Sequence, residues 1–166
     1  MPKAAESRIR VTPAAPSDVA VIATMIGELA EYERLSAMVC VTELMVTEAL
    51  FGARPAAEAI VGHWDDEPVA FAVYFTNFST FLGRPGLYLE DLFVRPAARR
   101  RGIGRVMLGY LAKLCVERGY GRMEWAVLDW NESAIGFYKG LGAAAMSDWT
   151  VFRLTGEALT RLSEES

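Results

Sequence analysis

The sequence has few of the residues that build disulfide frameworks or metal sites. Its 166 residues include two cysteines, Cys40 and Cys115, and a single histidine, His63. The cysteines lie far apart without a Cys-x-x-Cys spacing, which argues against a disulfide framework, and His63 has no second metal ligand at a suitable spacing. Cys115 also falls on the apolar row of a predicted helix. We therefore expect neither a bound metal nor a covalent cysteine mechanism.

Long apolar runs and a strong charge are also lacking. No run approaches the roughly 18 apolar residues that cross a bilayer, and residues 1–7 do not resemble a secretory signal, so we expect a cytoplasmic protein that does not bind membranes. The formal net charge of −4 argues against binding to nucleic acid. Because no repeat or long linker divides the chain, we expect one domain over residues 1–166, with residues 1–7 flexible.

The apolar periodicity predicts a mixed α/β fold. The predicted fold is a central, mostly antiparallel sheet flanked by helices, followed by a parallel strand-helix-strand crossover that should be right-handed. Turns are expected at 65–68 and 83–86, and a charged tail follows residue 154. Helices are expected from Ser17 or Asp18, over 42–51, from 104 to about 118 and over 131–138. Strands are expected at 8–12, 57–62, 69–75, 87–94, 123–128 and 150–154.

One loop combines arginines with two glycines between a predicted strand and a predicted helix. It reads Arg99-Arg100-Arg101-Gly102-Ile103-Gly104. Unpaired backbone N–H groups at a helix N-terminus favour phosphate, and arginine forks match phosphate oxygens. The alternative interpretation is a solvated charge run. A dinucleotide fingerprint would need a third glycine at Met107, and a P-loop would need a Gly-Lys-Ser/Thr ending that is absent. The loop therefore predicts a pyrophosphate site.

A second motif makes the loop more specific. Asn131-x-x-Ala134-x-x-Phe137-Tyr138, ending in Leu141-Gly142, follows the loop after one helix and one strand. Together with Arg99-Arg100-x-Gly102-x-Gly104 it resembles the two signatures of the GNAT superfamily of N-acetyltransferases. The resemblance extends over about residues 8–154. It implies a GNAT-like acyl-CoA N-acyltransferase fold, acetyl-CoA as acyl donor, and a homodimer.

The resemblance also implies roles for individual residues. Tyr138 would be the acid that protonates the departing thiolate, although its aromatic ring could instead simply pack a helix on the sheet. Glu90 would be the base, acting through water, or would hold the substrate's ammonium group. The acyl donor would be bound by Leu92, Phe93, Val94, Arg99, Arg100, Arg101, Gly102, Ile103, Gly104, Arg105, Asn131, Ser133, Ala134 and Tyr138.

The acceptor is predicted from acidic residues near the strand 87–94. In a regular strand Glu90 and Asp91 point to opposite faces, and a carboxylate buried in a sheet needs a cation, a proton relay or a salt bridge. The sequence here is similar to diamine and polyamine (spermidine/spermine) and thialysine acetyltransferases. That similarity implies an acidic wall for an amine with a second ammonium, formed by Tyr32, Glu33, Glu90, Asp91, Glu124, Trp125 and Ala126.

Three other functions remain open at this point. The protein could acetylate a protein N-terminus, a lysine or an antibiotic amine, it could bind acetyl-CoA without catalysis, or it could bind a dinucleotide.

Overall fold

A computed structural model describes residues 8–165, and the chain divides into two compact units, residues 1–126 and residues 127–166. The predicted flexibility of residues 1–7 lies outside the described residues. Among residues 8–165, no helix is both long and apolar enough to cross a membrane.

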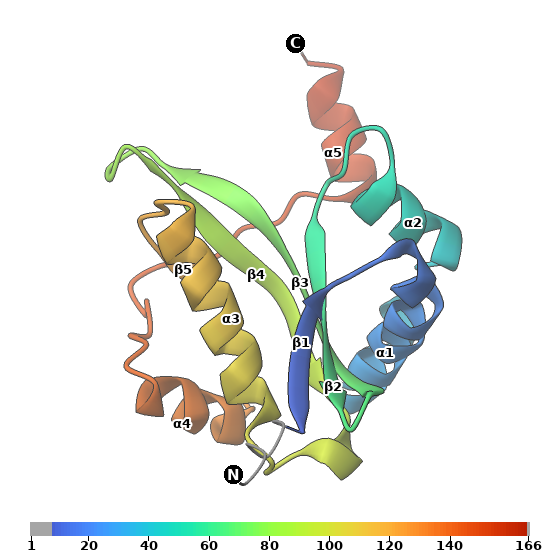
Figure 1. Cartoon of the computed structure of the whole chain (residues 1–166). Helices are drawn as coiled ribbons and strands as arrows, with labels where there is room; N and C mark the ends of the chain where they lie inside the picture. Colours follow the sequence, from blue (N-terminus) through green and yellow to red (C-terminus); the bar gives the residue numbers. More distant parts are fainter. Residues whose placement is uncertain (1–7, 166) are drawn as a thin grey trace, which may run out of the picture. The chain divides into compact units, whose positions relative to one another are not determined.

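The first unit is built on a five-stranded sheet in which the strands follow chain order (Figure 1). The first four strands pair antiparallel and the last pair is parallel, as the sequence predicts. The strands are β1 (Ile9–Pro13), β2 (Glu58–Trp64), β3 (Glu67–Ser79), β4 (Arg84–Val94) and β5 (Met123–Trp125).

Three helices cover the two faces of this sheet. One face is covered by α1 (Val19–Tyr32) and α2 (Glu43–Phe51), and the other by α3 (Ile103–Glu117) (Figure 1). Gly62 of β2 allows α3 to pack close to the sheet, because a Cβ at this position would lie 2.8 Å from the sulfur of Met107. Short 3-10 helices complete the unit: η1 (Pro16–Asp18), η2 (Ser36–Met38) and η3 (Pro96–Ala98).

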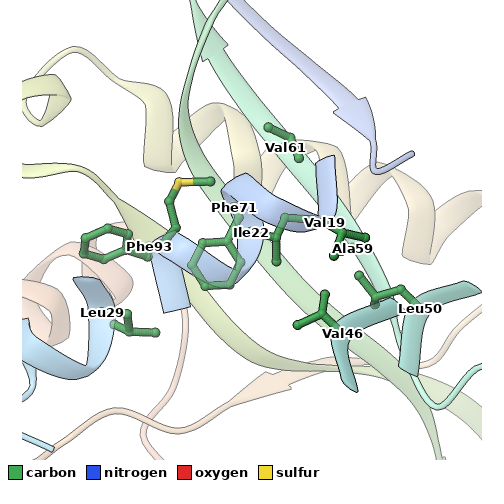
Figure 2. Packing of buried hydrophobic residues seen from close by; sticks show 10 residues of the cluster. Val19, Ile22, Leu29, Val46, Leu50, Ala59, Val61, Phe71 and Phe93 are labelled. Carbon is green, nitrogen blue, oxygen red and sulfur yellow. The ribbon is translucent and has the colours of Figure 1, made fainter. Parts of the chain in front are cut away.

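The main apolar core lies between the sheet and the helices α1 and α2. Figure 2 shows Phe71 of β3 and Phe93 of β4 facing Ile22 and Leu29 of α1. Phe71 and Ile22 are fully buried, and burying such a side chain contributes about 1.5–3 kcal/mol. The end of α1, which borders the site described below, therefore packs on this buried core.

Two turns differ from the predicted ones. The turn between β2 and β3 contains only Asp65 and Asp66, both with positive φ, which is the geometry of a tight two-residue hairpin. Gly86, predicted in a turn, lies inside β4. A Cβ at Gly86 would lie 2.7 Å from Asn77 Oδ1 and 3.1 Å from the Arg122 carbonyl oxygen, so glycine is needed there for a close approach.

The second unit contains α4 (Glu132–Gly140) and α5 (Gly156–Ser163). The helix predicted over 131–138 is confirmed, and it begins at a cap formed by Asn131, whose side chain accepts a hydrogen bond from the backbone N–H of Ala134 at 3.2 Å. The strand predicted at 150–154 is wrong: these residues pair with no strand, and β-propensity alone does not form one. The predicted charged tail instead contains the helix α5.

Candidate active site

A β-bulge in β4 determines where the predicted acidic residues lie. Val73 of β3 pairs with Asp91, while Tyr74 pairs with Leu89, so Glu90 is an extra residue in β4. The extra residue shifts the alternation of side chains by one position. Because paired residues share a face of the sheet, Asp91 lies with Val73 on the α1 face, and the bulge places Leu89 on the other face. β4 is therefore not a regular strand at Glu90 and Asp91, and a regular strand was the condition under which the two side chains were expected to point to opposite faces.

The pairing of β4 with β5 ends beside the bulge. β5 pairs with Leu87, Tyr88 and Leu89, and its last residue, Trp125, lies opposite Leu89. Residues 90–94 continue β4 beyond the last of these pairs. Of this segment, Phe93 is buried, whereas Leu92 and Val94 are half-buried. The edge of β4 that faces β5 thus continues past the end of its partner strand.

Three carboxyl groups lie around the bulge near the end of α1. Glu33 caps the C-terminus of α1, Glu90 is exposed on the bulge, and Asp91 is half-buried. Burial, together with the negative charges of Glu90 and Glu33, raises the pKa of Asp91 to about 6. Burial also raises the pKa of Glu33. A cation bound here would lower the electrostatic cost of keeping these carboxylates together.

The predicted loop leads into α3 as expected. Gly102 is the N-cap of α3 with φ of 82°, a conformation that favours glycine, and Arg100 also has positive φ. The first intrahelical bond runs from the N–H of Val106 to the carbonyl of Gly102. The N–H groups of Ile103, Gly104 and Arg105 therefore lie in the first turn, where helix geometry provides no carbonyl partner.

The arginines of the loop differ in what their side chains contact. The Arg99 guanidinium lies 4.3 Å from the ring centroid of Tyr32, and its Nε donates to the Val94 carbonyl at 2.9 Å. The Arg101 guanidinium lies 4.8 Å from the Trp64 ring centroid. Arg100 and Arg105 are exposed. The three consecutive arginines therefore occupy three different environments and do not form one charge run.

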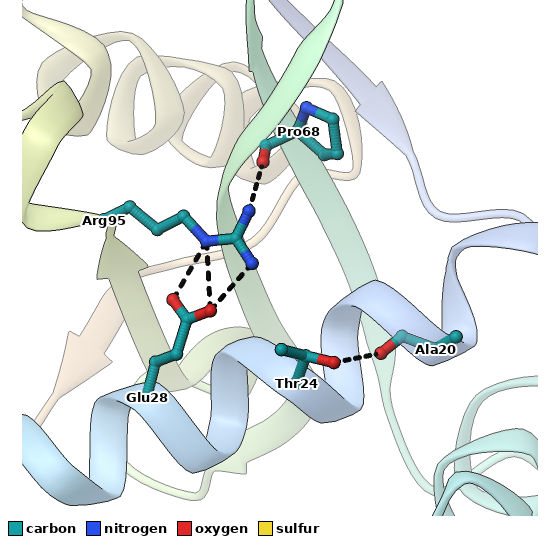
Figure 3. Close-up of polar contacts among 5 residues, drawn as sticks. All are labelled: Ala20, Thr24, Glu28, Pro68 and Arg95. Carbon is teal, nitrogen blue, oxygen red and sulfur yellow. Dashed lines mark hydrogen bonds and ion pairs between the residues drawn. The ribbon is translucent and has the colours of Figure 1, made fainter.

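Sequence reasoning missed the ion pair that joins the end of β4 to α1. Figure 3 shows Arg95 between the Glu28 carboxylate and the Pro68 carbonyl. Arg95 donates to Glu28 through Nε at 2.9 Å and through Nη2 at 2.7 Å. No local signal in the sequence pairs Glu28 with Arg95, because the two residues are 67 positions apart.

The remaining predicted residues lie on β5 and α4. Glu124 pairs with Arg122 at 3.0 Å, Trp125 ends β5 half-buried, and Ala126 follows it exposed. Four predicted residues belong to the second unit. Asn131 is the N-cap of α4, and Ser133, Ala134 and Tyr138 lie within the helix. The Tyr138 ring is 5.5 Å from that of Phe137.

Metal ligands do not gather in the part of the chain that the structure describes. Among residues 8–165, no group of three or more His, Cys, Asp or Glu side chains could hold a metal ion. His63 is buried, and its Nδ1 has no hydrogen-bond partner within this part of the chain.

Comparison with known proteins identifies the class. Residues 27–143 match the model of the Acetyltransferase (GNAT) family. The chain belongs to this family and is an acyltransferase.

Individual relatives extend the match to nearly the whole chain. An L-ornithine N5-acetyltransferase of Arabidopsis thaliana is 32% identical over 95% of this chain and 88% of its own. A thialysine N-epsilon-acetyltransferase of Bos taurus is 34% identical over 93% of this chain and 97% of its own. The fold is also that of an integron cassette protein from the mobile metagenome of V. cholerae. That structure has a TM-score of 0.79 at 23% identity, covering 95% of this chain and 98% of its own.

Proposed function

We propose that the protein transfers an acetyl group from acetyl-CoA to a primary amine of a small polyamine, diamine or thialysine-like substrate. The main observation in favour of an amine acceptor is that Asp91 is half-buried beside Glu33 and Glu90. A buried carboxylate is costly unless a cation neutralises it. A substrate with a second ammonium group would supply that cation.

The proposed binding site for acetyl-CoA is formed by the loop at residues 99–104 and by β4. In our proposal the N–H groups of the first turn of α3, with Arg100 and Arg105, bind the pyrophosphate of acetyl-CoA. The pantetheine arm would pair with the backbone of Leu92 to Val94, where β4 continues past β5. The same backbone would supply an N–H group to polarise the thioester carbonyl.

The proposed reaction is a direct transfer. Glu90, acting through water, takes a proton from the substrate ammonium, and the neutral amine nitrogen attacks the thioester carbonyl. The tetrahedral intermediate then collapses as the carbon–sulfur bond breaks. Tyr138 donates its phenolic proton to the departing thiolate, and the second proton lost by the amine nitrogen returns Tyr138 to its protonated form, which leaves the amide and free CoA. The donor-binding roles of Asn131, Ser133, Ala134 and Tyr138 stay predictions from the sequence.

The relatives support the acceptor class. Thialysine and ornithine, which the two curated relatives are named for, each carry a side-chain amine together with a second amino group. Besides the α-carboxylate of the amino acid, such an acceptor carries a second ammonium group, which is opposite in charge to the carboxylates of Glu33, Glu90 and Asp91. Tyr32, Glu124, Trp125 and Ala126 complete the proposed acceptor wall, where Trp125 offers an aromatic face to a cation.

An amine panel tests the proposal. The protein is mixed with acetyl-CoA and each of several amines: diamines, thialysine, ornithine, monoamines of equal length, aminoglycosides and peptides. Free thiol release is followed. We expect release with diamines and diamino acids at lower KM than with matched monoamines. Preference for peptides or aminoglycosides would assign a different acceptor, and acetyl-CoA binding without any release would indicate a non-catalytic module.

The homodimer and the cytoplasmic location remain predictions. Light scattering of the purified protein tests the first, and fractionation of cells tests the second.

A further inference from the structure

Two arginines hold one face of α1 at successive turns. Glu28 and Tyr32 are four residues apart, which places them on the same face of the helix. Arg95 and Arg99 are also four residues apart and flank η3. Arg95 holds Glu28 through hydrogen bonds from Nε and Nη2 (Figure 3), and Arg99 lies over the ring of Tyr32. We call these four residues the α1 clamp.

The clamp is anchored to the sheet at both arginines. The Arg95 side chain also donates to the Pro68 carbonyl at 3.0 Å, and its backbone N–H donates to the Val69 carbonyl at 2.9 Å. Arg99 is anchored by its Nε bond to the Val94 carbonyl, and its guanidinium lies 5.7 Å from the Phe93 ring centroid. Arg95 therefore connects α1 to the start of β3, and Arg99 connects α1 to the end of β4.

The anchors hold the Arg99 guanidinium over Tyr32 at the end of α1. The planar guanidinium is stacked on Tyr32 and its Nε–H is donated to Val94, so a phosphate fork that uses Nε would have to break this bond. The neighbouring Arg100 and Arg105 are exposed near the first turn of α3. Charge for a pyrophosphate is thus available from them without Arg99.

Glu33, the residue that follows Tyr32, connects the α1 clamp to the proposed acceptor site. Glu33 caps α1 directly after Tyr32 and lies near enough to Asp91 for the two carboxylates to interact. A shift of the last turn of α1 would move Glu33 away from Asp91. We infer that Arg99 is a positioning residue for the acceptor amine: by holding Tyr32, it keeps Glu33 near Asp91, and its side chain does not bind the phosphates of the donor.

This inference rests on the proposed function, and its test separates donor binding from acceptor binding. The variants are Arg99→Gln, which removes the guanidinium, Arg99→Lys, which keeps a cation, and the matched control Arg100→Gln in the same loop. For each, the Kd of acetyl-CoA is measured by calorimetry. The KM of a diamine and kcat are measured at saturating acetyl-CoA, and thermal unfolding verifies the fold.

We expect R99Q to raise the amine KM by about fivefold or more, with kcat and the acetyl-CoA Kd within about twofold of the wild type. R99K should lie between R99Q and the wild type, because a cation over Tyr32 is partly restored. R100Q should do the reverse and weaken acetyl-CoA binding. A weaker acetyl-CoA affinity in R99Q with an unchanged amine KM would overturn the inference.

A double variant tests whether Arg99 acts through Tyr32. If it does, adding R99Q to Tyr32→Leu changes the amine KM by less than about twofold beyond Y32L alone. Independent, multiplicative effects would contradict the inference. Should the wild-type protein release no thiol with any amine, the proposed function fails, yet the calorimetry still decides whether the Arg99 side chain binds the donor phosphates.

Discussion

Replacing Asp91 by asparagine should stabilise the protein while impairing its activity. The pKa of this carboxyl is about 6 in the folded protein because burial and two neighbouring carboxylates disfavour its charge, against an ordinary value of 3.8. Between these values the folded state binds more protons than the unfolded state, so stability falls as the pH rises from about 4 to 6. Above pH 6 Asp91 is charged in both states, and the decrease in the free energy of unfolding has its full value.

The magnitude follows from the two pKa values. Each pKa unit corresponds to about 1.4 kcal/mol, so the ionised Asp91 lowers the free energy of unfolding by about 3 kcal/mol at pH 8 and by about 1 kcal/mol at pH 4.5. An asparagine side chain has nearly the size of the aspartate side chain and carries no charge. The variant Asp91→Asn should therefore gain up to about 3 kcal/mol at pH 8 and much less at pH 4.5.

Urea unfolding followed by tryptophan fluorescence measures this difference at both pH values. The exposed Glu31→Gln on α1 is the control and should change the free energy of unfolding by less than about 0.5 kcal/mol at either pH. The amine KM of D91N should rise at least tenfold, about 1.4 kcal/mol, because one partner of the ammonium is lost. A D91N protein that is less stable than the wild type at pH 8, or whose gain does not depend on pH, would refute the reasoning.

Three further changes have expected outcomes. Lowering the pH below about 6 should raise the amine KM as Asp91 becomes protonated, while the Kd of acetyl-CoA measured by calorimetry changes less. Tyr138→Phe should lower kcat by about tenfold or more with little change in either KM, and an unchanged kcat would remove Tyr138 as the acid. Gly86→Ala should lower the free energy of unfolding by about 1–3 kcal/mol, because its Cβ meets Asn77 Oδ1 and the Arg122 carbonyl. The matched control Gly109→Ala, where the added Cβ meets nothing within 4 Å, should not lower it.

Local chemistry was enough to predict most of the fold. Thr42 caps α2 with its side chain, Gly102 and Gly119 border α3, and Asn131 caps α4, each as the residue types indicate. Such signals depend on neighbours within about four residues and can be read from the sequence. The strand expected at 150–154 failed because a strand exists only with a partner, which no local pattern specifies.

The site could be predicted only in part for the same reason. The loop and the carboxyl groups were found from their residue types. The bulge that turns Asp91 toward α1 depends on the register between β3 and β4, and the pairing of Arg95 with Glu28 depends on how α1 crosses the sheet. Both are properties of the tertiary structure, so a sequence that names the charged residues does not say which of them meet.

The most direct test of the proposed acceptor site compares a diamine with the monoamine of equal length in the thiol-release assay. The acidic cluster of Glu33, Glu90 and Asp91 predicts that the diamine has a kcat/KM at least about tenfold higher, and that this preference disappears in D91N. Equal kcat/KM values for the two amines in the wild-type protein would contradict the proposal that this cluster selects the acceptor.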